Sequence, residues 1–125
     1  MESEFHPARG EIYTARLDPT EGSELRKTRP VLIVSNDIDN RYSPVVLVVP
    51  LTEHKSGRAY PTEVLIHPPE AGVTKASRIQ CTQIRVLDKR RLRDPDGETL
   101  KKWGAVSTDI LQAVNESLKI ALGLP

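Results

Sequence analysis

Arg29 stands directly before Pro30, where the chain enters the aliphatic run Val-Leu-Ile-Val of residues 31–34. A proline cannot donate a backbone hydrogen bond to a sheet, so Pro30 belongs at the entrance of the strand that this run predicts. The residue before a proline is pushed toward extended dihedral angles, which fixes the Arg29 backbone at the mouth of a rigid strand. A guanidinium held there is a candidate phosphate-binding group, because its fork of donors matches two phosphate oxygens.

Length, composition and charge limit the classes of protein to consider. The 125 residues are 38% hydrophobic, which supports one ordinary core, so we expect a single domain over residues 1–125. The net charge of +1 excludes a polycation that coats nucleic acid through charge alone. Two local basic clusters are each either a phosphate site or a solvated face: Arg26, Lys27 and Arg29, and then Lys89, Arg90, Arg91 and Arg93.

Cysteine use and the N-terminal sequence indicate the compartment. The single Cys81 excludes an intrachain disulfide and a metal site of four thiolates. The first ten residues, MESEFHPARG, have acids where a secretory signal has cations and an apolar core. No stretch approaches the roughly 20 apolar residues of a membrane span. We therefore expect a soluble, cytoplasmic protein that makes no contact with a membrane.

Apolar runs and alternation predict five strands, at residues 10–17, 30–35, 45–51, 62–66 and 77–87. The second is a continuous aliphatic run in its centre, which indicates a strand covered on both faces, and the third is another nearly continuous aliphatic run. Residues 36–44 are predicted to form a turn-rich connection, and 94–97 a turn with a short helical turn after it. The third strand ends at Thr52.

One amphipathic helix is predicted at the C-terminus. Val106, Ile110, Val114 and Leu118 recur at helical spacing, with Ser107 as a possible N-cap and Gly123 as a terminator. Five short strands and one helix suggest a small, strongly curved sheet or barrel. We expect a frayed N-terminus over residues 1–8, the barrel over about 9–92, and the helix over about 106–122.

Four sequence blocks carry a family resemblance. In order, RGEIYTARLDPTEGSE, RPVLIVSND, VVPLT and QIRVLDKRRL resemble the MazF/PemK family of toxin endoribonucleases from type II toxin–antitoxin systems. The resemblance runs from about Arg9 to Leu122. It implies a mainly β fold, an SH3-like barrel of strongly curved antiparallel strands (CcdB/PemK-like) with a C-terminal helix.

The resemblance also implies partners and an activity. Such toxins work as homodimers, are held inactive by a cognate antitoxin protein, and cut single-stranded RNA, chiefly mRNA, at short sequences. They are mRNA interferases that need no metal and no cofactor. The alternative is a toxin of the same fold that binds a protein target such as a topoisomerase without cutting RNA.

Arg29 and Thr52 are the positions that the resemblance assigns to the scissile phosphate. RNA can be cut without a metal because its own 2′-OH attacks the phosphate, giving a 2′,3′-cyclic phosphate and a 5′-hydroxyl. Arginine suits the stabilisation of charge and suits general-base work badly, because the pKa of a guanidinium lies far above neutral and its uncharged form is very rare. Other roles remain open: an ion pair with Glu24 for Arg29, and a backbone-bonded hydroxyl for Thr52.

RNA-binding residues also follow from the resemblance. Ser23 and Glu24 match a family loop that contacts bases or sugar, and Ser77 and Gln83 match further contacts. The alternative for all four is a polar side chain that faces solvent and binds no RNA. At Thr82 many relatives carry an acid, and this chain departs from them.

The histidines offer a different ribonuclease mechanism, since a pair of histidines is the usual acid–base couple for RNA cleavage. Of the three, only His54 lies near the proposed site in sequence, either as a solvated loop residue or in contact with substrate. The loop 53–61 has its own composition, so the cleaved sequence is not transferred from relatives.

Overall fold

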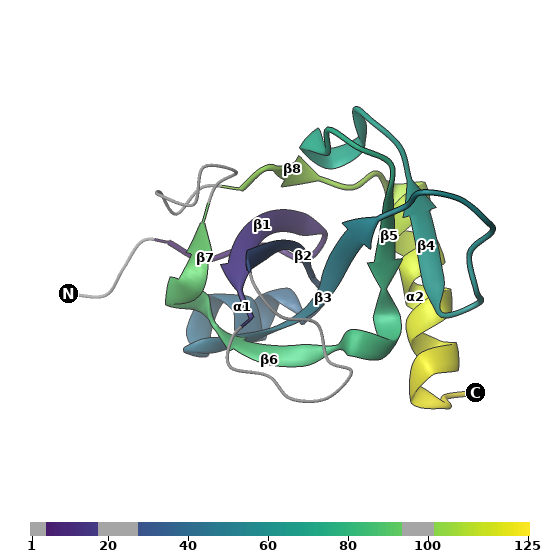
Figure 1. Cartoon of the computed structure of the whole chain (residues 1–125). Helices are drawn as coiled ribbons and strands as arrows, with labels where there is room; N and C mark the ends of the chain where they lie inside the picture. Colours follow the sequence, from purple (N-terminus) through teal and green to yellow (C-terminus); the bar gives the residue numbers. More distant parts are fainter. Residues whose placement is uncertain (1–4, 18–27, 94–101) are drawn as a thin grey trace.

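The computed structural model describes residues 5–17, 28–93 and 102–125, and within these ranges the chain forms a curled sheet with two α-helices (Figure 1). Ser23, Glu24 and the turns predicted near 18–22 and 94–97 lie outside the described residues. The elements are β1 (Glu11–Arg16), β2 (Thr28–Ile33), α1 (Asp37–Tyr42), β3 (Val45–Glu53), β4 (Glu63–Ile66), β5 (Ser77–Gln80), β6 (Arg85–Asp88), β7 (Leu92–Arg93), β8 (Gly104–Ala105) and α2 (Thr108–Leu122).

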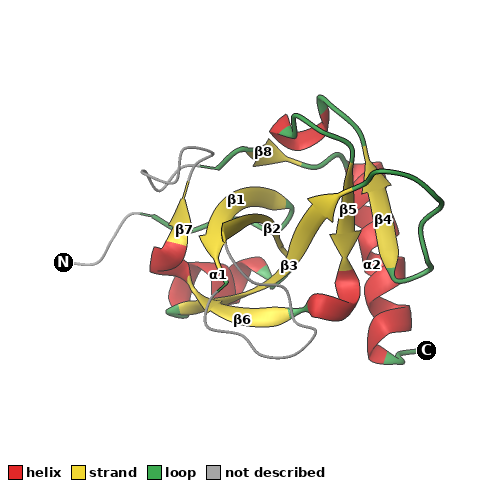
Figure 2. Ribbon diagram, viewed as in Figure 1, coloured by secondary structure: helices red, strands yellow, loops and turns green. Residues whose placement is uncertain are grey.

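The sheet is antiparallel and has β3 near its centre. Its order is β4-β5-β3-β2-β1-β7, with β6 also paired to β3 and β8 paired to β1. One edge of β3 pairs with β2, while the other pairs with β6 over Val45–Val48 and with β5 over Leu51–Glu53. Among the described strands no pairing joins β4 to β7, so the sheet curls strongly without closing (Figure 2). The predicted fold class, mainly β with strongly curved antiparallel strands and a C-terminal helix, is confirmed.

Two apolar clusters lie on the two faces of the curled sheet. Neighbouring residues alternate between them, so that Ile12 and Leu32 join one cluster while Tyr13 and Val31 join the other. Both clusters draw on β1, β2 and β3, which is why the aliphatic run at 31–34 is buried throughout. The expectation that this strand is covered on both faces is confirmed.

The segment predicted as one strand over 77–87 is broken in the structure. A 3₁₀ helix, Cys81–Gln83, separates β5 from β6. Both strands pair with the same edge of β3, so the interruption lets the chain bend with the curl of the sheet. The Cys81 side chain is buried at this bend, and burial raises the pKa of its thiol to about 11. The prediction of one continuous strand was wrong, because the alternation of apolar and polar residues does not show where a strand bends.

The connection between β2 and β3 contains a helix that the sequence did not predict. In α1, Asn36 caps the N-terminus by accepting a hydrogen bond from the Asp39 backbone N–H (2.9 Å). Asn40 is buried, and its amide donates to the Ser35 carbonyl oxygen (2.9 Å). The apolar residues of this helix, Ile38 and Tyr42, are exposed, so capping and one buried polar contact, not a buried apolar face, mark it.

The C-terminal helix forms where the sequence predicts it. It begins at Thr108, and Ser107 Oγ accepts from the Ile110 N–H (3.3 Å). Gly123 ends it in the left-handed region at φ 70°. Val114 and Leu118 pack into the apolar cluster that contains Leu51 and Ile79. None of the helices in the described ranges has the length and apolar character of a membrane span.

Part of the expected frayed N-terminus packs against the sheet. Residues 1–4 lie outside the described residues, but Phe5 meets the ring of Tyr13 edge-on, with ring centroids 5.9 Å apart. Pro7 is buried as well. The chain is therefore in contact with the fold before β1 begins.

Candidate active site

Arg29 and Thr52 line one pocket of about 200 Å³ where β2 begins and β3 ends. The pocket thus brings together the two residues that the family resemblance selected. It draws on two strands and on the segment that leads to β5. The other lining residues are Thr28, Pro30, Leu51, Glu53, Val73, Thr74, Lys75, Ser77 and Trp103.

Strand pairing explains why Arg29 and Thr52 line the same pocket. β2 and β3 are adjacent and antiparallel, with Val31 opposite Pro50. This is the last pair between the two strands, and Arg29 and Thr52 each lie two residues beyond it, at the same end of the β2–β3 pairing. On its other side β2 pairs with β1, where Arg29 faces Ala15. Arg29 is therefore part of a paired strand, which begins at Thr28, two residues before the predicted start at Pro30.

Thr52 makes a side-chain hydrogen bond that the sequence did not predict. Its Oγ1 accepts from the Gln80 Nε2, at 2.9 Å. Thr52 lies opposite Arg78 in the β3–β5 pair, and Gln80 is two residues further along β5. The sequence had left open a backbone-bonded hydroxyl; the contact found is with an amide side chain.

The other predicted RNA-binding residues divide into three groups. Ser77 lines the pocket with Arg29 and Thr52, and its Oγ donates to the Lys75 carbonyl oxygen (2.9 Å). Gln83 is half-buried at the end of the 3₁₀ helix and does not line this pocket. Ser23 and Glu24 lie outside the described residues. The structure therefore places three of the six predicted site residues, Arg29, Thr52 and Ser77, around one space.

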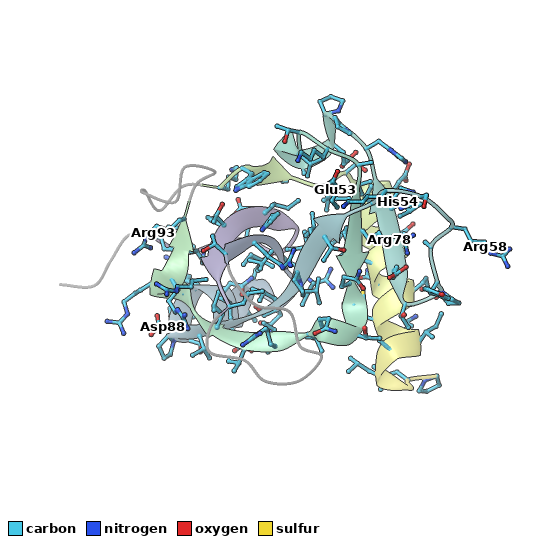
Figure 3. The ribbon with its side chains drawn as sticks, in the orientation of Figure 1. Glu53, His54, Arg58, Arg78, Asp88 and Arg93 are labelled. Carbon is cyan, nitrogen blue, oxygen red and sulfur yellow. The ribbon has the colours of Figure 1, made fainter. Side chains whose placement is uncertain are left out.

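Arg78 joins β5 to the loop that follows Thr52. Its guanidinium donates to His54 Nδ1 (3.0 Å), to Glu63 Oε1 (2.8 Å) and to the Ser56 carbonyl oxygen (2.8 Å). Figure 3 shows Arg78 and His54 close together beside β5, with Arg58 projecting away from the ribbon. Because Arg78 donates to His54 Nδ1, that nitrogen is the acceptor in the neutral imidazole and Nε2 carries the hydrogen. His54 is thus a positioned loop residue, half-buried next to the site.

The loop itself forms a second hollow next to the site. Its lining includes Arg58, Tyr60 and Arg78, and Tyr60 has 69% of its surface exposed. Glu63 Oε1 also accepts from the Tyr60 N–H (3.1 Å), so the same carboxylate binds both Arg78 and the loop backbone. The 53–61 loop is therefore anchored to β4 and β5 at both ends.

Lysines and arginines of the second basic cluster make local contacts at the other side of the molecule. Lys89 Nζ donates to the carbonyl oxygens of Asn40 and Arg41 at the end of α1 (3.1 Å each). Arg90 pairs with Asp88, and this hydrogen-bonded partner lowers the pKa of Asp88 to about 2. Figure 3 places Asp88 and Arg93 on the opposite side of the view from His54 and Arg78. Within this cluster, Lys89 therefore holds the end of α1, while Arg90 pairs with its near neighbour Asp88.

The sequence did not predict that three further residues belong to the site or border it: Gln80, Arg78 and Trp103. Gln80 and Arg78 are alternate residues of a predicted strand and so share a face, which was the available signal. Nothing in the sequence says which strand that face meets. Trp103 packs its ring beside the core and donates from Nε1 to Thr14 Oγ1 (2.8 Å), while also lining the pocket.

The described residues contain no group of three or more His, Cys, Asp or Glu side chains that could hold a metal ion.

Comparison with known proteins identifies the family. The family model described as "PemK-like, MazF-like toxin of type II toxin-antitoxin system" matches residues 8–122. A curated relative, "Endoribonuclease MazF" of Staphylococcus saprophyticus, is 39% identical over 116 residues, which cover 93% of this chain and 91% of the relative.

Solved structures agree with this assignment. An "Endoribonuclease in complex with its cognate antitoxin from Mycobacterial species" is 31% identical, with a TM-score of 0.74 over 95% of this chain and 97% of that one. MazF from Deinococcus radiodurans is 25% identical, with a TM-score of 0.77 over 97% of this chain and 100% of that one. The chain therefore belongs to the PemK-like, MazF-like toxins of type II toxin–antitoxin systems.

Proposed function

We propose that this MazF-type toxin endoribonuclease cuts single-stranded RNA, chiefly mRNA, in the pocket shared by Arg29 and Thr52. The 2′-oxygen attacks the adjacent phosphorus, the bond from phosphorus to the 5′-oxygen breaks, and the products are a 2′,3′-cyclic phosphate and a 5′-hydroxyl. The 2′-OH proton passes to solvent, and the leaving 5′-oxygen takes up a proton. No metal ion takes part.

One observation carries this proposal: a cation and a hydroxyl from neighbouring strands line the same pocket. Charge builds on the nonbridging oxygens as the 2′-oxygen attacks, and Arg29 stabilises that charge because it stays cationic at any working pH. Thr52 hydrogen-bonds a phosphate oxygen and helps hold the in-line geometry. Both residues belong to paired strands, so their backbones are already in place when RNA binds.

Recognition of the RNA sequence falls to four polar residues, of which Ser77 lines this pocket. Ser77 already donates its hydrogen to the Lys75 carbonyl, so its oxygen serves as an acceptor for a base amino group or a 2′-OH. Gln83, together with Ser23 and Glu24, provides further contacts to bases or sugar. Amide and hydroxyl groups can read base edges, which charge alone cannot do.

A cognate antitoxin and a second copy of the chain are the protein partners in this proposal. Leu47 and Val86 face each other across β3 and β6, and each has more than two fifths of its surface exposed. Val45, on the same face of β3, is 40% exposed. Such a patch suits the homodimer implied by the family, with Leu122 and Leu124 near the end of α2 as a further exposed apolar surface.

The test is cleavage of a long, mostly unstructured RNA by the purified protein in EDTA, with the new 5′ ends mapped. Arg29→Ala and Thr52→Val are compared with Arg90→Ala, a matched control that removes an exposed arginine paired with Asp88 at the other side of the molecule. A DNA of the same sequence is included, because it lacks the attacking 2′-OH.

We expect cuts at one short recurring sequence, with 5′-hydroxyl ends, in the wild type and in Arg90→Ala. Loss of one transition-state donor costs roughly 10²–10³ in rate, so Arg29→Ala and Thr52→Val should be slower by about that factor. DNA should stay intact. Full cleavage by folded Arg29→Ala would overturn the assignment. No cleavage of two unrelated transcripts by the wild type would favour a toxin that acts by binding a protein.

A further inference from the structure

Gln80 holds a fixed place next to the proposed catalytic hydroxyl. It is the last residue of β5, a strand paired with β3 on one side and β4 on the other. Its partner on β4 is Glu63. The next residue, Cys81, is buried and donates its backbone N–H to the Thr62 carbonyl oxygen (3.0 Å). The Gln80 backbone is therefore held against β4, one residue beyond Ile79, which pairs with Leu51 of β3.

From this place the Gln80 side chain reaches diagonally across the sheet. The direct neighbour of Thr52 on β5 is Arg78, and Gln80 is two residues beyond it on the same face. Its Nε2 donates to Thr52 Oγ1 at 2.9 Å, a good hydrogen-bond length. Arg78 is itself held by His54 and Glu63, so its side chain does not compete for the hydroxyl.

The direction of this hydrogen bond limits what Thr52 can do. A threonine hydroxyl has one hydrogen to donate and two lone pairs to accept with. The Gln80 amide occupies one lone pair, and the hydroxyl keeps its hydrogen for another partner. Hydrogen bonds in a chain polarise one another, so a hydroxyl that accepts from an amide becomes a better donor and a poorer proton acceptor.

We propose that Gln80 is a positioning residue that makes Thr52 a hydrogen-bond donor to a nonbridging oxygen of the scissile phosphate. This inference rests on the proposed function and deepens it, because it assigns Thr52 to charge stabilisation beside Arg29 and not to removal of the 2′-OH proton. Gln80 itself does not touch the reacting atoms.

Gln80→Leu is the central variant, because leucine has a similar volume and cannot donate. It is measured alone and in a Thr52→Val background, with kcat and KM determined on a short RNA that contains the mapped cut site. Gln80→Glu keeps the length of the side chain but turns the donor into an acceptor that takes the Thr52 hydrogen. Gln112→Leu, at an exposed position on α2, is the matched control.

We expect Gln80→Leu to lower kcat about three- to tenfold with little change in KM, the loss expected for one neutral hydrogen bond. Gln80→Glu should lose more, and Gln112→Leu nothing. In the Thr52→Val background, Gln80→Leu should cause no further loss, because the group through which it acts is gone. A purely structural role would lower the rate by the same factor in both backgrounds.

Other results would refute either the role of Gln80 or the proposed function itself. Normal kcat in folded Gln80→Leu, an equal loss with and without Thr52, or wild-type rates in Gln80→Glu would overturn the role of Gln80 while leaving RNA cleavage by Arg29 and Thr52 intact. Absence of cleavage by the wild type, or full cleavage by Arg29→Ala, would instead refute the proposed function. Circular dichroism of each variant establishes that it is folded before the rates are compared.

Discussion

Arg78→Met should destabilise the protein and loosen the loop that borders the active site. Arg78 and Glu63 form a salt bridge of 2.8 Å whose side chains are only 17% and 11% exposed. Removing one partner of a fully buried pair costs about 3–5 kcal/mol, because the remaining charge is left without compensation. Partial exposure reduces that figure, so we expect a loss of about 2–3 kcal/mol. For a chain of this length that corresponds to a fall in Tm of roughly 10 °C.

The loss should reach the loop as well as the fold. Arg78 also donates to His54 and to the Ser56 carbonyl oxygen, so the methionine variant releases the segment between β3 and β4. We expect a higher KM for RNA with a smaller change in kcat, because Arg29 and Thr52 stay on their strands. Urea denaturation measures the free energy of unfolding, and hydrogen exchange of the backbone amides from residues 54 to 61 reports on the loop.

The double variant Arg78→Met with Glu63→Gln separates the two effects. The glutamine carries no charge but can still accept from the Tyr60 N–H, as Glu63 does. Unfolding free energy should recover by at least half, while fast exchange in the loop and the raised KM should persist. A loss below about 1 kcal/mol in Arg78→Met, or no recovery in the double variant, would show that the charge pair is not the source of the stability.

Three further predictions concern alkaline pH, the helix cap and the apolar patch. Burial raises the pKa of the Cys81 thiol to about 11 and that of the Tyr13 phenol above its usual range, so the unfolded state gives up these protons at lower pH than the folded state. The free energy of unfolding should therefore fall as the pH rises from about 9 to 11, and urea titrations should show a shallower fall in Tyr13→Phe; an equal fall would contradict this account. Ser107→Ala should cost about 1 kcal/mol in thermal denaturation because the Ile110 N–H loses its cap, whereas Ser107→Asp should keep most of the stability. Leu47→Glu should shift the mass measured by light scattering from that of a dimer to that of a monomer while an exposed change on α2, Gln112→Glu, does not; a dimer in both would place the interface elsewhere.

Local patterns account for most of the predicted elements. The aliphatic run at 31–34 is buried, and the run at 45–51 forms β3, in which residues 48–51 are buried while Val45 and Leu47 are exposed. A continuous apolar run indicates a strand between two covering layers, and alternation indicates a strand covered on one face. The α2 helix likewise follows from the spacing of its apolar residues, with Ser107 and Gly123 at its ends. By contrast, α1 depends on a buried asparagine that bonds the nearby Ser35, and the bend at Cys81–Gln83 contains a cysteine buried in the core; neither feature shows as apolar periodicity.

For the candidate site, the sequence by itself determined that an arginine precedes a buried strand and that a threonine ends the next one, since strand entry and exit are set by nearby residues. Only the tertiary structure decided which side chains surround them. The pairing of β2 with β3 brings Arg29 and Thr52 to one pocket, and the pairing of β5 with β3 brings Gln80 to the Thr52 hydroxyl. Register is set by how two distant segments bury their apolar faces together, and a one-residue slip would turn every one of these side chains to the other face of the sheet.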